Sequence, residues 1–218
     1  MSVRSSELKA ERATSELRFF RKPEIRYRHV KRAIDLVFVV LAAPAIALLV
    51  AACAVAILVT MGRPAFFVQK RTGYGGRVFR MYKLRTMRTS TSNDIVATSK
   101  NDPRITALGH FLRVSHLDEL PQLLNIFKGD MTLVGPRPEQ PELVTAYRSC
   151  LPEYDLRHSV VPGLTGWAQV KYGYASDLHE TKEKLAYDIY YVRNVGPVLD
   201  LHIAVRTFLV YSNLDYVR

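Results

Sequence analysis

The feature that most constrains this chain is an apolar run from Leu36 to Met61, 26 residues that include no charged side chain. A bilayer core about 30 Å thick is crossed by about 20 helical residues, so this run is long enough to reach through it. The run is too long, and begins too far from Met1, to fit a cleaved signal peptide. A buried helix of a soluble protein is the less favoured alternative at this length. We therefore predict a membrane-bound protein.

Pro44 divides this run into two arms, and a proline removes a backbone donor and clashes with the preceding helical turn. Neither arm alone is long enough to span a bilayer comfortably. Basic residues flank the run on both sides: Arg26, Arg28, Lys31 and Arg32 before it, and Arg63, Lys70 and Arg71 after it. Because cytoplasmic flanks are enriched in lysine and arginine, both ends are expected in the cytoplasm. We predict a re-entrant helix that bends at Pro44, with a kinked spanning helix as the alternative.

The formal net charge of +11 indicates an anionic partner, which leaves nucleic acid, anionic lipid headgroups and phosphorylated substrates open. Residues 1–35 contribute +5 and residues 62–93 contribute +8, whereas residues 94–218 contribute −2. Because the excess charge flanks the apolar run, we expect membrane lipid and a phosphorylated substrate, and no nucleic-acid partner. The two cysteines, Cys53 and Cys150, suggest no disulfide framework, which fits a reducing compartment.

The local patterns predict an α+β fold that is mainly helical. Residues 65–85 alternate around a glycine-rich turn and predict a small β-hairpin, which a polar loop follows over 86–103. Helices are expected at about 106–114, 117–127, 139–148, 152–158, 178–194 and 197–213, with short strands within 129–141 and 161–170. We predict three parts: a polar basic extension at 1–28, a membrane anchor at 29–62, and a cytosolic catalytic domain with amphipathic, interfacial helices at 63–218.

The sharpest candidate for chemistry is the sequence SHLDELP at 115–121, with the adjacent carboxylates of Asp118 and Glu119. Adjacent carboxylates at a helix start face different directions, so one can act as a nucleophile while the other holds a metal. The structural alternative is a capping box between Ser115 and Asp118, followed by a first-turn proline. His110 and His116 lack the partner spacing of a zinc site and are predicted to be surface or cap residues.

Five bases in the segments around the two carboxylates favour the functional alternative: Lys83, Arg85, Arg104, Arg113 and Arg137. Arg137 stands between Pro136 and Pro138, which stiffen the backbone that presents it. A planar guanidinium matches a pair of phosphate oxygens better than an ammonium does. For Arg80 and Arg88 we favour a solvated or lipid-facing position.

The motifs and their order closely resemble the bacterial sugar transferases, which are monotopic polyprenyl-phosphate phosphoglycosyl transferases that initiate exopolysaccharide or glycan assembly. The resemblance covers about residues 29–212 and rests on motifs in fixed order: KRAIDL at 31–36, FFVQKRTGYGG at 66–76, FRMYKLRTM at 79–87, DPRITALGHFLR at 102–113, LDELPQLLNIFKGDMTLVGPRPE at 117–139 and PGLTGWAQV at 162–170. One departure is Ala43-Pro44, where the family often has Ser-Pro at the helix break.

The resemblance implies that Asp118 attacks the β-phosphate of a UDP-sugar and that Glu119 helps to hold Mg²⁺. It places the family's Pro-Arg-Pro arginine on Arg137 and its basic residue ahead of the dyad on Arg113. The predicted substrate- and phosphate-binding set is Arg137, Arg113, Lys83, Arg85, Arg104 and Gln69.

The implied function is transfer of a sugar-1-phosphate from a UDP-sugar to polyprenyl (undecaprenyl) phosphate, with release of UMP, through a covalent aspartyl-phosphosugar intermediate. The expected location is the inner (cytoplasmic) membrane, with the catalytic domain on the cytoplasmic face. The rival from another class is a basic, membrane-tethered interaction module in which Asp118 and Glu119 only begin a helix. The motifs do not mark the sugar, and a hexose is a weak preference.

Overall fold

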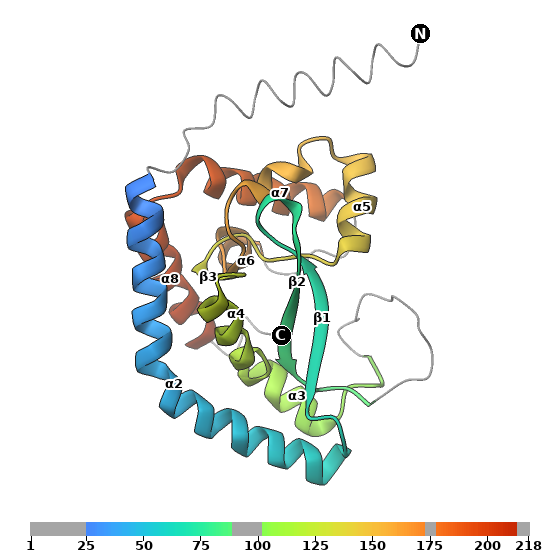
Figure 1. The fold of residues 1–218 in the computed structure, drawn as a ribbon. Helices are drawn as coiled ribbons and strands as arrows, with labels where there is room; N and C mark the ends of the chain where they lie inside the picture. The colour runs from blue at the N-terminus through green and yellow to red at the C-terminus, as the bar shows by residue number, and fades with distance from the viewer. Residues whose placement is uncertain (1–24, 89–101, 173–177, 213–218) are drawn as a thin grey trace.

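The computed structural model describes residues 25–88, 102–172 and 178–212. Nearly all of the predicted extension at 1–28 and most of the predicted loop at 86–103 lie outside these ranges. In Figure 1 one long helix runs along the side of a body built from a hairpin and shorter helices. The fold is mainly helical, as predicted, with two small two-stranded sheets.

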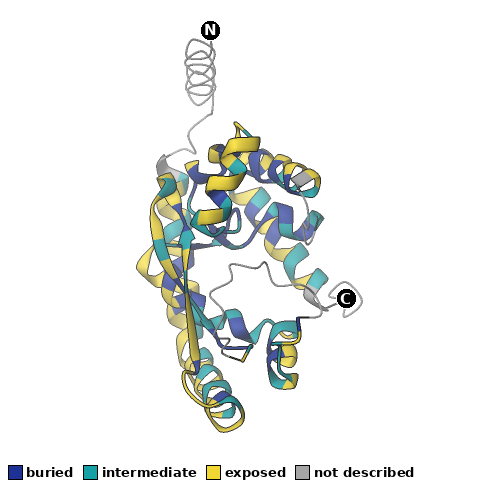
Figure 2. Ribbon diagram, turned by 90° about the vertical axis from the view of Figure 1, so that its right-hand side faces the viewer, coloured by how far each residue is buried: buried dark blue, intermediate teal, exposed yellow. Residues whose placement is uncertain are grey.

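The long helix, α2 (Ile25–Met61), is continuous over 37 residues and contains Pro44. Figure 1 shows that it bends part of the way along, as expected for a helix that loses one backbone hydrogen bond to proline. Within the described residues, the stretch Tyr27–Met61 is long and apolar enough to cross a membrane. Large apolar side chains such as Leu41 and Leu48 are about three-quarters exposed (77% and 76%), so this surface suits a lipid environment (Figure 2).

The first arm of α2 is fastened to the body by polar contacts. The buried carboxylate of Asp35 accepts hydrogen bonds from Thr132 Oγ1 (2.6 Å) and from the Leu133 amide (3.1 Å). Arg32 donates to the carbonyl of Phe127 at 2.7 Å and to that of the preceding residue, Ile126. A buried carboxylate costs free energy unless it is hydrogen-bonded, so Asp35 fixes this arm in place.

The other end of α2 is fastened by Arg85. Its guanidinium donates to the carbonyls of Met61 (2.6 Å), Gly62 (2.5 Å) and Arg63 (2.9 Å). The last carbonyls of a helix lack intrahelical partners, and Arg85 supplies donors for them. Both ends of α2 are therefore attached to the same globular body.

The predicted hairpin is confirmed. Strand β1 (Phe66–Thr72) pairs antiparallel with β2 (Val78–Leu84), with Phe66 opposite Leu84 and Thr72 opposite Val78. The turn, η1 (Tyr74–Gly76), places Gly75 and Gly76 at φ values of 63° and 76°, which glycine adopts without steric cost.

The predicted helix at 106–114 is confirmed as α3 (Ala107–Val114), whose N-cap side chain, Thr106, accepts a hydrogen bond from the Gly109 amide at 3.0 Å. The helix predicted at 117–127 is wrong in its first part. It begins as a 3₁₀ helix, η2 (Leu117–Gln122), and only then continues as α4 (Leu123–Lys128). Pro121 lacks the amide hydrogen that a regular helix needs at this point.

The capping box predicted as the structural alternative does not form. Ser115 ends α3, and its hydroxyl donates back to the Phe111 carbonyl at 2.7 Å. His116 occupies the N-cap position of η2 in the left-handed conformation, with φ 55° and no side-chain cap hydrogen bond. The abrupt turn between α3 and η2 is therefore made by His116.

The second sheet is a parallel pair of β3 (Thr132–Val134) and β4 (Gly163–Thr165). The strand predicted within 161–170 covers only β4, because residues 167–171 form a short helix, α6 (Trp167–Lys171). The remaining predicted helices correspond to α5 (Pro141–Cys150), the 3₁₀ helix η3 (Tyr154–Ser159), α7 (Leu178–Asn194) and α8 (Pro197–Ser212).

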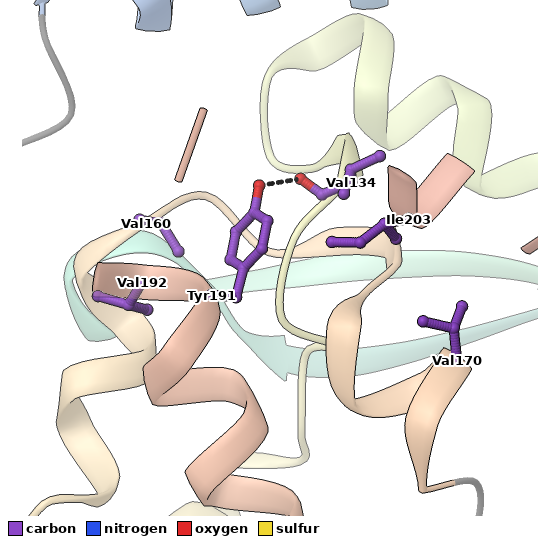
Figure 3. Close-up of a cluster of buried hydrophobic side chains, with 6 residues drawn as sticks. All are labelled: Val134, Val160, Val170, Tyr191, Val192 and Ile203. Atoms are coloured by element: carbon purple, nitrogen blue, oxygen red, sulfur yellow. Dashed lines mark hydrogen bonds between the residues drawn. The ribbon is translucent and has the colours of Figure 1, made fainter. Parts of the chain in front are cut away.

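A core of buried side chains joins this sheet to α7 and α8 (Figure 3). Its centre is Tyr191, which is 1% exposed and donates a hydrogen bond to the Val134 carbonyl at 3.0 Å. The other members are Val160, Val170, Val192 and Ile203. This core holds β3, which leads directly into the segment that carries Arg137.

Candidate active site

Asp118 and Glu119 lie in the first turn of η2, where the chain leaves α3 through the left-handed residue His116. The Glu119 amide donates to the His116 carbonyl at 3.1 Å, which closes this turn. Successive residues of a 3₁₀ helix point about 120° apart, because three residues complete one turn. The two adjacent carboxylates therefore enter different surroundings.

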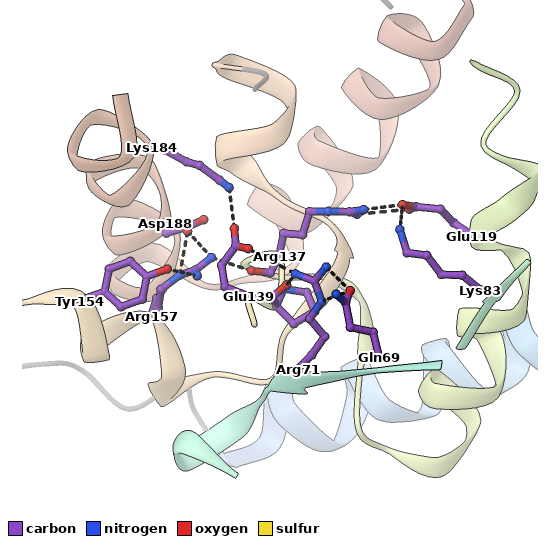
Figure 4. Close-up of polar contacts among 11 residues, drawn as sticks. Gln69, Arg71, Lys83, Glu119, Arg137, Glu139, Tyr154, Arg157, Lys184 and Asp188 are labelled. Carbon is purple, nitrogen blue, oxygen red and sulfur yellow. Dashed lines mark hydrogen bonds and ion pairs between the residues drawn. The ribbon is translucent and has the colours of Figure 1, made fainter. Parts of the chain in front are cut away.

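Glu119 is held by two bases from separate parts of the chain (Figure 4). Lys83 Nζ, on β2, lies 2.8 Å from Glu119 Oε1. Arg137 donates to Oε2 at 3.2 Å and also contacts Oε1 through its other terminal nitrogen. Burial would raise the pKa of Glu119, but the charges of Arg137 and Lys83 outweigh it and hold the pKa well below the usual range. Glu119 is thus a fixed anion at neutral pH.

Asp118 is buried, with 7% of its surface exposed, and accepts no hydrogen bond from any residue that the structure describes. Burial raises the pKa of Asp118 to about 6, and the negative charge of Glu119 adds to this effect while Lys83 opposes it. At neutral pH the group is mostly ionised but poorly solvated. A partly desolvated carboxylate without hydrogen-bond donors suits a nucleophile.

Three further side chains near the dyad contribute to its electrostatic surroundings. Burial lowers the pKa of Lys83, although the neighbouring Glu119 charge opposes that shift. Burial also lowers the pKa of His116, so its imidazole is neutral at pH 7. Arg113 donates to Thr86 Oγ1 at 2.9 Å, and its charge favours the ionised form of Asp118. The structure thus brings Lys83, Arg137 and, at longer range, Arg113 to the predicted dyad.

Three other predicted site residues make their contacts elsewhere. Arg85 is directed at the carbonyls at the end of α2, and Arg104 pairs with Asp102 at 2.6 Å. Gln69 Oε1 accepts hydrogen bonds from Arg71 at 2.6 Å and 3.1 Å. None of these contacts reaches Asp118 or Glu119, and substrate binding by the three residues stays a prediction.

The sequence patterns missed a buried ionic network behind Arg137 (Figure 4). Its members are Arg71, Glu139, Tyr154, Arg157, Lys184 and Asp188. Arg157 and Asp188 are each 3% exposed at the side chain, and they pair at 2.8 Å across 31 positions of sequence. No local spacing marks such a pair. The single available signal was Glu139, which directly follows the Pro-Arg-Pro segment.

The carboxylate oxygens of the dyad fit the Mg²⁺ that the family resemblance implies. Glu119 Oε2 accepts one hydrogen bond at 3.2 Å, and the Asp118 carboxylate accepts none within the described residues. Mg²⁺ is usually bound by one or two carboxylates together with waters and substrate phosphates. In the ranges that the structure covers, no three His, Cys, Asp or Glu side chains group as metal ligands. The donor set therefore fits a metal shared with a bound diphosphate.

Comparison with known proteins identifies the family of the chain. The family model described as "Bacterial sugar transferase" matches residues 26–213. The chain is 41% identical over 186 residues to a UDP-N-acetylgalactosamine-undecaprenyl-phosphate N-acetylgalactosaminephosphotransferase of Aeromonas hydrophila, a match that covers 85% of this chain and 44% of the relative.

Two further relatives are named UDP-glucose:undecaprenyl-phosphate glucose-1-phosphate transferase. The protein of Xanthomonas campestris pv. campestris is 44% identical over 163 residues, which cover 73% of this chain and 34% of the relative. The protein of Caulobacter vibrioides is 39% identical over 180 residues, which cover 81% of this chain and 67% of the relative. The chain spans less than half the length of the first two of these three relatives. By the family model and these identities, the chain belongs to the bacterial sugar transferase family.

Proposed function

We propose that this protein transfers a sugar-1-phosphate from a UDP-sugar to undecaprenyl phosphate and releases UMP. The names of the relatives support this substrate pair, although they include both glucose and N-acetylgalactosamine enzymes. The observation that carries the proposal is the contrast within the dyad. Asp118 is buried with a pKa raised to about 6 and no hydrogen-bond donor among the described residues, whereas Glu119 is held by Lys83 and Arg137.

In the first step, a carboxylate oxygen of Asp118 attacks the β-phosphorus of the UDP-sugar. A P–O bond forms to Asp118 while the bond from the β-phosphorus to the bridging oxygen breaks, and UMP leaves with the bridging oxygen. The product is an acyl phosphate that carries the sugar. Lys83 and Arg137 stand beside the dyad, where their positive charges stabilise the charge that develops on the leaving phosphate.

In the second step, a phosphate oxygen of undecaprenyl phosphate attacks the same phosphorus. The bond to Asp118 breaks, the carboxylate is regenerated, and the product is a lipid-linked diphosphate sugar. Splitting the exchange in this way lets a soluble donor and a membrane-bound acceptor use one nucleophile in turn. When bound, Mg²⁺ would neutralise the diphosphate, and Glu119 is the residue we expect to help hold it.

The attachment of α2 supports a re-entrant anchor on the cytoplasmic side. Asp35 ties its first arm to β3, and Arg85 ties its last turn to the body that carries the dyad. A helix whose two ends are fastened to one globular body returns to the side from which it came. The basic residues on both flanks favour the cytoplasmic side, where the UDP-sugar is found.

The test is release of UMP by the purified protein in detergent or nanodiscs. We expect release with Mg²⁺, undecaprenyl phosphate and one of a panel of UDP-sugars, and its loss in Asp118→Asn. Asp155→Asn, which removes an exposed carboxylate, is the matched control and should leave release unchanged. A protein with no release on any UDP-sugar of the panel would favour the rival view of a membrane-tethered interaction module.

A further inference from the structure

The segment that presents Arg137 is Pro136-Arg137-Pro138, and it has an unusual shortage of backbone donors. Pro136 and Pro138 carry no amide hydrogen, so the segment cannot be held by a regular strand ladder. Apart from the Arg137 amide, the backbone groups that remain to fix it are its carbonyls. Each of these carbonyls accepts a hydrogen bond from a distant part of the chain.

The carbonyls of Arg137 and Pro138 are bound by arginine side chains. Arg157 donates to the Arg137 carbonyl at 2.6 Å, and Arg71 donates to the Pro138 carbonyl at 3.1 Å. Hydrogen bonds from a charged donor are stronger than neutral ones and more directional in a buried setting. Two guanidinium groups thus bind consecutive carbonyls directly after the Cα atom that carries the Arg137 side chain.

The carbonyls of Pro136 and of Glu139, which follows the segment, are bound by backbone amides. The Gly163 amide donates to the Pro136 carbonyl at 3.0 Å, and the Thr72 amide donates to the Glu139 carbonyl at 2.8 Å. Gly163 can approach this closely because it has no side chain, since a Cβ atom there would lie 2.1 Å from the Gly135 nitrogen. The segment is therefore held from β4, from β1 and from η3 together.

The two arginines are themselves held in place. Asp188 and the Tyr154 hydroxyl contact Arg157, at 2.8 Å and 2.9 Å. Arg71 is held by Gln69 and by Glu139, and the distance to the Glu139 carboxylate is 3.3 Å. Because the two guanidinium groups are held by these contacts, they also fix the position of the carbonyls to which they donate.

We propose that Arg71 and Arg157 form a carbonyl clamp, two positioning residues that hold the Arg137 guanidinium on Glu119. Neither arginine needs to touch the substrate for this role. Through the clamp, η3 and α7 fix the position of the Arg137 guanidinium in the active site. The proposal deepens the proposed function, because it assigns what orients one of its phosphate-facing groups.

The test variant is the double substitution Arg157→Gln with Asp188→Asn. Removing both charges avoids leaving one buried ion unpaired, which would destabilise the fold by itself. The matched control is Val144→Ala, since Val144 is 1% exposed in the same local core as Tyr154 but touches no carbonyl of the segment. Thermal unfolding of both variants identifies the range of temperatures in which each is folded, and turnover is compared within that range.

We expect the test variant to lose about 10- to 100-fold in turnover while folded, as for a misplaced catalytic group, and Val144→Ala to keep its rate. The same double substitution in an Arg137→Ala background should lower turnover further by less than about twofold, because the side chain that the clamp positions is already gone. Equal losses in the two backgrounds would overturn the clamp and assign the pair a general structural role.

A second measurement does not depend on turnover. Phenylglyoxal modifies accessible arginines, and the rate at Arg137 is read by peptide mass spectrometry. Arg137 is 28% exposed at its side chain in the intact site, so the test variant should react faster there than the parent or Val144→Ala. If the parent releases no UMP, the proposed function fails and this rate alone decides the clamp. An unchanged rate at Arg137 overturns it.

Discussion

Asp118 and Glu119 follow each other in the chain, yet their carboxylates have opposite electrostatic surroundings. Glu119 contacts Lys83 at 2.8 Å and Arg137 at 3.2 Å, while Asp118 accepts no hydrogen bond within the described residues. The pKa of Asp118 is about 6, and that of Glu119 lies well below its ordinary value. The difference follows from the 3₁₀ turn, which brings the Glu119 carboxylate into direct contact with the two bases, whereas Asp118 is influenced by their charges without a hydrogen bond to either.

Incubation with a UDP-sugar alone should attach a sugar phosphate to the peptide that contains Asp118. Because no lipid acceptor is present, the first step can proceed while the second cannot. Intact-protein and peptide mass spectrometry would detect the added mass, and Asp118→Asn should show none and lose at least about 10³-fold in turnover. An adduct on another residue, or full activity of Asp118→Asn, would contradict the assignment.

The first step should depend on pH through Asp118. Only the ionised carboxylate attacks, so the second-order rate constant of the first step, measured in a single turnover, should fall about tenfold per pH unit below a midpoint near 6. A UDP-sugar contains no phosphate monoester, whose second pKa lies near 6, so the donor should not contribute this midpoint. UMP release measured without lipid phosphate isolates the step. A midpoint near 4, the ordinary range of a carboxyl group, would show that burial does not tune Asp118.

Glu119→Gln should weaken the binding of Mg²⁺, so that a higher Mg²⁺ concentration is needed, and should slow turnover without unfolding the protein. A neutral amide is a poorer ligand for a hard cation, and it also weakens two charge-assisted contacts to Lys83 and Arg137. We expect a loss of about 1.5–3 kcal/mol, which is roughly a 10- to 150-fold loss in rate. Titration of Mg²⁺ against turnover measures both effects. Glu142→Gln, an exposed acid in the first turn of α5, is the control. Identical Mg²⁺ titrations for Glu119→Gln and the parent would assign Glu119 no metal role.

Replacing Pro44 with leucine should change the topology of part of the population. Leucine restores a backbone hydrogen bond and removes the ring clash, which together favour a straight helix by about 3 kcal/mol. A straight apolar run of 26 residues is about 39 Å long and can span a bilayer. Ala43→Leu, which keeps the proline, is the control.

Cysteine labelling in intact cells measures this change. In a protein without Cys53 and Cys150, we expect Ser5→Cys and Ser90→Cys to be protected from outside label while Pro44 is present. With Pro44→Leu, position 5 should become labelled in the fraction that spans, and that fraction should be inactive. Labelling of position 5 in the parent would show that the anchor spans the membrane.

Local patterns predicted the elements whose determinants are close in sequence. The hairpin follows from alternation around a glycine turn, and α7 begins and ends at the predicted residues, Leu178 and Asn194. The capping box, which was the structural alternative, does not form because the Ser115 hydroxyl donates to a carbonyl of the preceding helix and does not cap the following one. Short motifs cannot distinguish these two uses of a serine hydroxyl.

Short sequence motifs predicted residues of the candidate site, but they did not predict the contacts between distant parts of the chain. Glu119 and Arg137 were named from the sequence and lie in contact in the structure, but the carbonyl partners of Arg85 were not predicted. Arg85 binds carbonyls at the end of α2, more than 20 positions away, and Arg157 meets Asp188 across 31 positions. Such contacts depend on how the elements pack, and periodicity within one element carries no information about them.

The contact between Arg32 and α4 has a consequence for the distance between the membrane and the chemistry. Arg32 donates to the last carbonyls of α4, and α4 directly continues the turn that carries Asp118 and Glu119. The first arm of α2 is therefore attached to the helix that follows the dyad, and we expect the depth of the anchor in the bilayer to set the distance between Asp118 and the lipid headgroups. Under the proposed function, we expect a thicker or thinner bilayer to change the rate of transfer to the lipid and to leave the reaction with the soluble nucleotide unchanged.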